Sequence, residues 1–245
     1  MTNPKISIII PCYNSEKWIS QCVESALSQD YDNYEVIAVD NESKDNSLQI
    51  LQELQSKSRD LVVSTAPNLY KYSWEEPVAE AMKYCTGEYF TILGSDDFLD
   101  SKYLSNISEI LVKAPQIRVM QSPLMGYDNE NRIDTGTLSH SYKSLKEFKS
   151  LLFEKSPVIT PTLVYKKELY DNGSIQWNSE KWVGSGDYNC YFNFTDLGIF
   201  IYPYPKWLGY FYRWHSDQST WGMHKNYSHI DINLREHWKK KWGMS

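Results

Sequence analysis

The sequence predicts an α/β protein with a Rossmann-like, mostly parallel sheet flanked by helices and a less regular second half. Three observations carry this prediction. Apolar runs of strand length alternate with segments of helical periodicity over the first hundred residues. Several of these runs end in acidic or other polar residues, as expected of strands whose carboxyl ends border a ligand site. After residue 97 the regular alternation gives way to short aromatic and polar segments.

The first half contains four expected strands. Residues 5–11, KISIIIP, form an apolar run that a proline ends, and residues 34–40, YEVIAVD, form a second run that ends in an acid. Residues 61–65 and 88–93 supply the third and fourth strands. Helices are expected between them, from a candidate N-cap at Ser15 to Ser28, after a turn that Ser43 can cap, and over 76–84. This spacing predicts parallel strands with helices on both faces.

The second half is harder to assign. Helices are expected at 102–113, 145–153, 187–195 and 226–241, and short extended segments at 118–121 and 161–165. Residues 126–136 are polar and rich in turn formers, residues 173–186 are irregular, and residues 200–214 alternate large aromatic side chains with other residues. No repeat, low-complexity segment or long linker divides the chain, so the two halves are expected to share one sheet in a single domain, residues 1–245.

Composition narrows the class of protein. The net charge of −6 predicts no basic face for nucleic acid. The four cysteines show no paired spacing, which favours a reduced, cytosolic compartment. No signal-peptide pattern and no apolar run of about 20 residues is present, so a cytoplasmic protein is expected. The lysines at 239–241, between two tryptophans, are either a solvated helix end or a peripheral contact with the inner face of a membrane.

The most informative stretch is EYFTILGSDD, residues 88–97. An apolar run of β-favouring residues leads into two adjacent carboxylates, Asp96 and Asp97. Because like charges this close repel, one carboxyl is driven toward its protonated form unless a cation is bound. A hard divalent cation with oxygen ligands, Mn²⁺ or Mg²⁺, is the expected partner. The alternative is that one of these aspartates only caps the helix that begins near Ser101.

The ends of the other strands bring matching chemistry. The first strand delivers Pro11, Cys12 and Tyr13, and the second ends in Asp40. No GxGxxG or GxxxxGK[ST] loop follows the first strand, which argues against a dinucleotide-binding Rossmann enzyme and a P-loop kinase. A nucleotide across these ends would place Asp40 within reach of the base or ribose. The alternative is an aspartate that only forms the turn after a strand.

Two segments carry a family resemblance: ISIIIPCYNSEKWISQCVESALSQDYDNYEVIAVDNESKDNS and, further on, CTGEYFTILGSDD. They resemble family-two glycosyltransferases of the A-type fold. The resemblance is dense over residues 6–97, weakens over residues 101–181, and returns at Asp187 and in the run Tyr-Arg-Trp-His that ends at His215. It implies that residues 1–100 bind a nucleotide-sugar and that residues 101–245 bind the acceptor.

The resemblance also implies roles for individual residues. Asp40 contacts the nucleotide base, and Asp96 and Asp97 form the metal-binding motif. Asp187 acts as the general base, and His215 approaches the metal or the diphosphate. The remaining predicted nucleotide-binding residues are Pro11, Cys12 and Tyr13, together with Asp96.

The chain departs from the family pattern at two places. The family has Asp-Asp-Gly-Ser after the second strand, and here Glu42 replaces the glycine, so a differently shaped turn is expected. Val78 and Ala79 replace an Arg-Asn pair that contacts the donor sugar, and Lys71 or Glu76 is the candidate substitute.

Further contacts with the diphosphate or the acceptor are assigned to Lys71, Arg213 and Trp182, and the alternative for Arg213 is a pairing with an acidic partner. Trp182 belongs to a set of aromatic side chains that either pack in the core or form the floor under an acceptor sugar. His215 has the alternative of a packed or surface imidazole, and Asp187 the alternative of a simple helix cap.

These expectations combine into one function. The chain is expected to be an inverting, metal-dependent hexosyl- or N-acetylhexosaminyltransferase that uses a nucleotide-diphosphate sugar, with UDP favoured. The acceptor is a hydroxyl of a saccharide or a lipid-linked molecule, as in polysaccharide biosynthesis. Two alternatives remain from the sequence: a sugar nucleotidyltransferase, and a non-catalytic protein that binds a nucleotide-sugar or carbohydrate.

Overall fold

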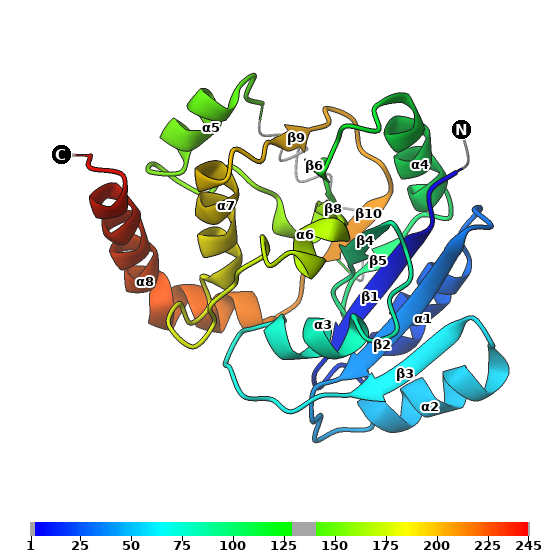
Figure 1. The fold of residues 1–245 in the computed structure, drawn as a ribbon. Coiled ribbons are helices and arrows are strands. Elements are labelled where there is room, and N and C mark those ends of the chain that lie inside the picture. The colour runs from blue at the N-terminus through cyan, green and yellow to red at the C-terminus, as the bar shows by residue number, and fades with distance from the viewer. Residues whose placement is uncertain (1–2, 129–140, 245) are drawn as a thin grey trace.

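The computed structural model describes residues 3–128 and 141–244, and it contains a seven-stranded sheet in the order β3-β2-β1-β4-β8-β6-β9 (Figure 1). The four strands expected in the first half are all present and mutually parallel. The strands of this sheet are β1 (Ile6–Cys12), β2 (Tyr34–Asp40), β3 (Leu61–Thr65), β4 (Tyr89–Ile92), β6 (Val119–Gln121), β8 (Val164–Lys166) and β9 (Ile201–Pro203). The predicted α/β fold class is therefore confirmed. Most of the predicted polar stretch 126–136 lies outside the described residues.

Both halves of the chain contribute to this sheet. Strand β8 pairs antiparallel with β4 and with β6, and β6 pairs parallel with β9. The parallel strands of the first half and the strands of the second half, which run in both directions, therefore form one continuous sheet. The segment predicted as extended at 161–165 divides into a 3-10 turn at Thr160–Thr162 followed by β8.

Helices cover both faces of the sheet because the central strands are apolar on both sides. Ile6, Ile8 and Ile10 of β1 face a core that includes residues of α1, α2 and α4, while Ile9 faces a second core built with α3, α5, α7 and α8. Figure 1 shows α7 and α8 together, well away from α2 and α4. The helices are α1 (Ile19–Leu27), α2 (Ser47–Lys57), α3 (Glu75–Ala81), α4 (Tyr103–Lys113), α5 (Leu145–Leu151), α6 (Glu168–Asp171), α7 (Gly186–Asp196) and α8 (Ser219–Lys241).

A second, three-stranded sheet positions the candidate site. Strand β10 (Tyr210–Arg213) lies between β5 (Phe98–Leu99), to which it is antiparallel, and β7 (Met125–Tyr127), to which it is parallel. Strand β5 begins directly after Asp97. This pairing therefore brings a segment from the end of the chain against the two adjacent carboxylates.

Three expectations about helix starts are wrong. Ser15 does not cap α1: its carbonyl accepts hydrogen bonds from the amides of Trp18 and Ile19 in a preceding turn, and its hydroxyl is bonded to that of Ser95. Helix α8 begins at Ser219 rather than at residue 226. The Ser43 hydroxyl accepts a hydrogen bond from the amide of Asn14 instead of capping α2. No helix in the described part of the chain is both long enough and apolar enough to cross a membrane.

Candidate functional site

The carboxyl ends of β1, β2 and β4 meet at one edge of the sheet, as predicted. Cys12 and Asp40 are opposite each other in the register of β1 and β2. The hydroxyls of Ser15 and Ser95, from the loops after β1 and β4, lie 2.6 Å apart. The predicted nucleotide-binding residues from these three strand ends therefore belong to one edge.

Asp40 has an unsatisfied oxygen at this edge. Its side chain is buried, Oδ2 accepts a hydrogen bond from the amide of Ser43 at 3.1 Å, and Oδ1 has no hydrogen-bond partner among the described residues. A buried acceptor without a donor is costly, so a ligand N–H or O–H at this position is favoured. Beside it, Pro11 and Cys12 are buried, and Tyr13 is 49% exposed, which leaves its ring available to a flat ligand.

Cys12 stays uncharged at this edge. Burial first, and then the charge of Asp40, raise the pKa of its thiol to about 12. It can line a nucleotide pocket as an apolar group, and it supplies neither a nucleophile nor a thiolate ligand.

The turn after Asp40 keeps the backbone shape that glycine would adopt. Glu42 has φ +59°, in the left-handed region. Glu42 therefore adopts a conformation that glycine takes without strain, at a cost of about 1–2 kcal/mol for a side chain with a Cβ. A turn shaped differently from that of the family stays a prediction. Strain of this kind is often kept at functional sites.

Asp96 faces His215. Its Oδ2 lies 3.0 Å from Nε2 of His215, and the two side chains are 31% and 12% exposed. His215 follows β10, so the small three-stranded sheet makes this contact across 119 positions of sequence. The His215 ring lies against Trp18, with ring centroids 5.3 Å apart, and its Nδ1 has no partner among the described residues.

Asp97 turns away from this pair. It is 3% exposed, Oδ2 accepts a hydrogen bond from the hydroxyl of Tyr210 at 2.6 Å, and Oδ1 accepts one from the backbone amide of Arg213 at 2.8 Å. Burial, followed by the nearby charge of Asp96, raises its pKa well above the usual range. The geometry argues against the predicted role of Asp97 as a cation ligand and assigns it to the joint between β4 and β10. Sequence reasoning did not identify Tyr210 as its partner.

Arg213 is not available to a ligand, contrary to the prediction. It is 1% exposed, Nε donates a hydrogen bond to the backbone carbonyl of Asp96 at 2.7 Å, and its guanidinium also binds Gln21. Its guanidinium lies 4.6 Å from the ring centre of Trp18 and 5.2 Å from that of Phe98. Burial lowers its pKa, with the two aspartates acting in the opposite direction. Arg213 therefore supports the backbone of the acidic pair from inside the protein.

Asp187 lies in the first turn of α7 and is partly exposed. Oδ2 accepts a hydrogen bond from the hydroxyl of Thr160 at 2.8 Å, and Oδ1 accepts one from the amide of Tyr188. Burial of the carboxyl is the largest cause of its raised pKa, which these hydrogen bonds partly oppose. A carboxylate whose pKa is raised is a stronger base than an exposed one. The contact with Thr160 had no signal in the sequence.

The remaining predicted contacts, Lys71, Trp182 and Glu76, lie in different environments. Lys71 is exposed, with Nζ 5.6 Å from the ring centre of Tyr72, and its role stays a prediction. Trp182 is 6% exposed and belongs to the core beside α8, which contradicts a role as acceptor floor. The Oε1 of Glu76 binds the amides of Leu69 and Tyr70, so it first serves to fix the loop before α3.

The lysines near the C-terminus are largely paired within the protein. Lys239 binds Glu236, and Lys241 binds Asp196 and lies over the ring of Trp238. These contacts favour the solvated helix end over a membrane contact.

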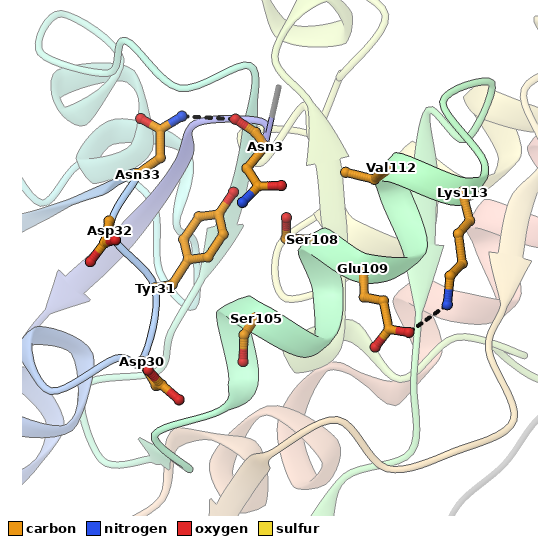
Figure 2. A pocket seen from close by; sticks show the side chains of 10 residues that line it. All are labelled: Asn3, Asp30, Tyr31, Asp32, Asn33, Ser105, Ser108, Glu109, Val112 and Lys113. Atoms are coloured by element: carbon orange, nitrogen blue, oxygen red, sulfur yellow. Dashed lines mark hydrogen bonds and ion pairs between the residues drawn. The ribbon is translucent and has the colours of Figure 1, made fainter. Parts of the chain in front are cut away.

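The larger of two described cavities is not at this site. It has a volume of about 490 Å³ and lies at the opposite, amino-terminal edge of the strands, between α4 and the segment that precedes β2. Figure 2 shows the ring of Tyr31 in it, with Asp30, Asp32 and Glu109 around it. Glu109 is paired with Lys113, and the Tyr31 hydroxyl donates to the carbonyl of Pro4. Because it is remote from the candidate catalytic residues, this cavity has no part in the chemistry considered below.

The donor set at Asp96 and His215 fits a divalent cation. Oδ2 of Asp96 and Nε2 of His215 lie 3.0 Å apart, the separation of a hydrogen bond between them, and both are atom types that Mn²⁺ accepts as ligands. Within the described residues no group of three or more His, Cys, Asp or Glu side chains is arranged to hold a metal. Two protein ligands suit an ion such as Mg²⁺ or Mn²⁺ that completes its coordination with substrate phosphates and water.

The strand order of the main sheet and the polar residues at the carboxyl ends of its parallel strands are those of an A-type glycosyltransferase fold. A family model described as Glycosyl transferase family 2 matches residues 7–173, and the chain belongs to that family. The predicted family is therefore confirmed.

Relatives and solved structures agree with this membership. The chain is 39% identical over 108 residues to a poly(ribitol-phosphate) beta-glucosyltransferase of Bacillus spizizenii, a match that covers 41% of this chain and 16% of the relative. It is 23% identical over 226 residues to an uncharacterized glycosyltransferase of Haemophilus influenzae, covering 89% of this chain and 68% of the relative.

Two solved structures show the same fold. The structure of S. aureus TarS 1-349 in complex with UDP-GlcNAc has a TM-score of 0.71 at 22% identity, over 88% of this chain and 60% of that one. The mannosyltransferase PcManGT from Pyrobaculum calidifontis, in complex with GDP-Man and Mn2+, has a TM-score of 0.67 at 17% identity, over 95% and 64%. The chain thus spans less than two thirds of the length of most of these proteins.

Proposed function

We propose that this chain transfers a sugar from a nucleotide-diphosphate sugar, UDP favoured, to a hydroxyl of a saccharide or lipid-linked acceptor, with inversion at the anomeric carbon. The observation that carries the proposal is the pair Asp96–His215 at the carboxyl edge of the sheet, beside the unsatisfied carboxylate oxygen of Asp40. Family membership supports sugar transfer. The UDP-GlcNAc complex of TarS supports UDP as the first nucleotide to test.

Different residues are proposed to bind the base and the diphosphate of the donor. Asp40 accepts a hydrogen bond from the base, and Pro11, Cys12 and the exposed ring of Tyr13 line the base pocket. Asp96 and His215 would hold Mn²⁺ or Mg²⁺, which would supply positive charge next to the leaving diphosphate. The Mn2+ in the PcManGT complex supports a divalent ion. Residues 1–100 supply most of the donor site, and His215 reaches it from the acceptor half.

Asp187 performs the proton transfer. It removes the proton from an acceptor hydroxyl, whose oxygen attacks the anomeric carbon on the face opposite the diphosphate. The bond from that carbon to the diphosphate oxygen breaks, and the nucleoside diphosphate leaves with the electron pair. An α-linked donor therefore gives a β-linked product. The raised pKa of Asp187 supports this role, because a general base works best when its pKa is close to the working pH.

A nucleotide-sugar panel tests this proposal. The protein is incubated with UDP-glucose, UDP-N-acetylglucosamine and GDP-mannose, with Mn²⁺ or with EDTA, and released nucleoside diphosphate is followed. Release from a UDP-sugar in Mn²⁺ and its loss in EDTA are expected. Binding without release would instead indicate a non-catalytic binding protein. Pyrophosphate formed from UTP and a sugar phosphate would indicate a nucleotidyltransferase.

A further inference from the structure

Backbone strain in the described chain falls in two places. Among the described residues four that are not glycine have positive φ: Asn14, Glu42, Tyr72 and Asn178. Asn14 and Glu42 lie together beside Asp40, since the Asn14 side chain accepts from the amide of Lys44 in the same turn. Tyr72 and Asn178 form the second pair. Because strain of this kind persists where the surroundings enforce it, and clusters at functional sites, the second place merits a functional explanation.

A cavity of about 270 Å³ lies at this second place, between the loop that precedes α3 and the loop that precedes α7. Its lining side chains are mixed donors and acceptors with one aromatic ring: Tyr70, Glu75, Asn178, Ser179, Glu180 and Lys181. None of the residues assigned above to the nucleotide or the cation lines it. It is therefore a separate feature of the surface.

Hydrogen bonds hold its two walls together. The hydroxyl of Ser73 donates to that of Ser179 at 2.8 Å, and the amide of Ser179 donates to Oε2 of Glu75 at 2.9 Å. Glu76 fixes the near loop through the amides of Leu69 and Tyr70, at 2.8 and 2.6 Å. The cavity is preformed, which lowers the entropic cost of binding.

The cavity wall continues into the helix that carries the proposed base. A Cβ on Gly186 would lie 3.1 Å from the hydroxyl oxygen of Ser179, so the loop packs directly on the residue before Asp187. An acceptor hydroxyl that loses its proton to Asp187 is attached to a body that must rest on neighbouring surface. This cavity lies next to that helix, and its lining comes from both halves of the chain, with Tyr70 and Glu75 from the first half and residues 178–181 from the second.

We propose that this cavity binds one ring or polyol unit of the acceptor, a polyhydroxylated carbohydrate, and so holds the acceptor for the transfer proposed above. This inference rests on the proposed function. The carboxylates of Glu75 and Glu180 accept hydrogen bonds from hydroxyls, Asn178 both donates and accepts, and Tyr70 offers a ring face. The volume of about 270 Å³ is below that of cavities that hold drug-sized ligands, and it suits a single small unit.

The test uses saturation-transfer NMR on the whole protein with UDP and Mn²⁺ present. The probes are methyl β-D-glucopyranoside, methyl N-acetyl-β-D-glucosaminide and ribitol 5-phosphate. The variants are Tyr70→Ala and Glu180→Ala, with Tyr84→Ala and Glu154→Ala as controls, because Tyr84 and Glu154 are exposed and lie outside the cavity lining. We expect at least one probe to bind the wild type and both controls, and to bind each cavity variant about tenfold more weakly, which is a loss of about 1.4 kcal/mol.

Three results would overturn the proposal: no probe binds the wild type, probe binding is unchanged in the cavity variants, or the variants lose UDP affinity along with the probe. The last result would make the cavity part of the donor site. Titration of UDP into the wild type is measured separately. Failure of UDP to bind would defeat the proposed function itself, whereas normal UDP binding with no probe effect would defeat only the acceptor cavity.

Discussion

Tyr210→Phe removes a single oxygen from the joint between β4 and β10. That hydroxyl donates to Oδ2 of Asp97 at 2.6 Å and accepts from the amide of Gly94 at 3.2 Å, and the side chain is 1% exposed. Because the raised pKa of Asp97 favours its uncharged form, the lost bond contributes about 0.5–1.5 kcal/mol, and a buried N–H without a partner costs about 1–3 kcal/mol. We therefore expect the free energy of unfolding to fall by about 1.5 kcal/mol or more.

Urea denaturation followed by fluorescence measures this loss. For a chain of this size it corresponds to a fall in Tm of roughly 3–6 °C. Tyr202→Phe is the matched control, because Tyr202 is 39% exposed and its hydroxyl makes no hydrogen bond within the described part of the chain. The double variant with Asp97→Ala should be less destabilised than the sum of the single variants, since both remove the same bond.

A loss below about 1 kcal/mol for Tyr210→Phe would refute the assignment of Asp97 to this joint, because even one neutral hydrogen bond contributes about that much. Additive effects in the double variant would refute it independently.

Three further predictions follow from the site. Glu42→Gly should raise the free energy of unfolding by about 0.5–1 kcal/mol, because φ +59° is relaxed for glycine; an unchanged or lower urea midpoint would contradict this. Asp40→Ala should weaken UDP binding by roughly 1–3 kcal/mol in calorimetry, the cost of leaving a donor on the base unpaired, and unchanged affinity in a folded variant would remove Asp40 from the site. Asp187→Asn should lower kcat by about 10²–10⁴-fold with UDP affinity unchanged. Because the base must be ionised and its pKa is raised, wild-type kcat should increase with pH through a pKa above the usual aspartate range, and this limb should be absent in the variant; its persistence would exclude Asp187 as the base.

The sequence was most informative about the first half of the fold. Strands β1, β2 and β4 are continuous apolar runs, because strands covered by helices on both faces have no polar side to reveal. Their acidic and polar ends are adjacent because parallel strands end at the same edge. These two rules are local, so they could be read directly from residue order.

The contacts of the second half could not be read in the same way. The pairing of Asp96 with His215 depends on a short pairing between β5 and β10, far apart in sequence. From the sequence, Arg213 can contact either the diphosphate or an acidic partner. Its burial among aromatic rings is a tertiary property that no local pattern records.

Helix α8 illustrates a local signal that tertiary packing overrides. The helix is expected from residue 226, and in the structure it extends back through Gly222 to Ser219, although glycine is a poor helix former. In the structure a Cβ at this position would lie 2.8 Å from the hydroxyl oxygen of Tyr72, so the glycine permits a close approach of the loop before α3. The helix therefore begins earlier than the propensity of its first residues indicates.

The central claim is that Asp96 and His215 present a divalent cation to the diphosphate of the donor. Calorimetric titration of UDP in Mn²⁺ and in EDTA, for the wild type, Asp96→Asn and His215→Ala, tests it most directly. We predict that Mn²⁺ tightens UDP binding to the wild type by about tenfold or more, within the usual range of coupling between two bound ligands, and that both variants lose this tightening while retaining their affinity in EDTA. Equal UDP affinity with and without Mn²⁺ in the wild type, or full tightening in both variants, would contradict the claim.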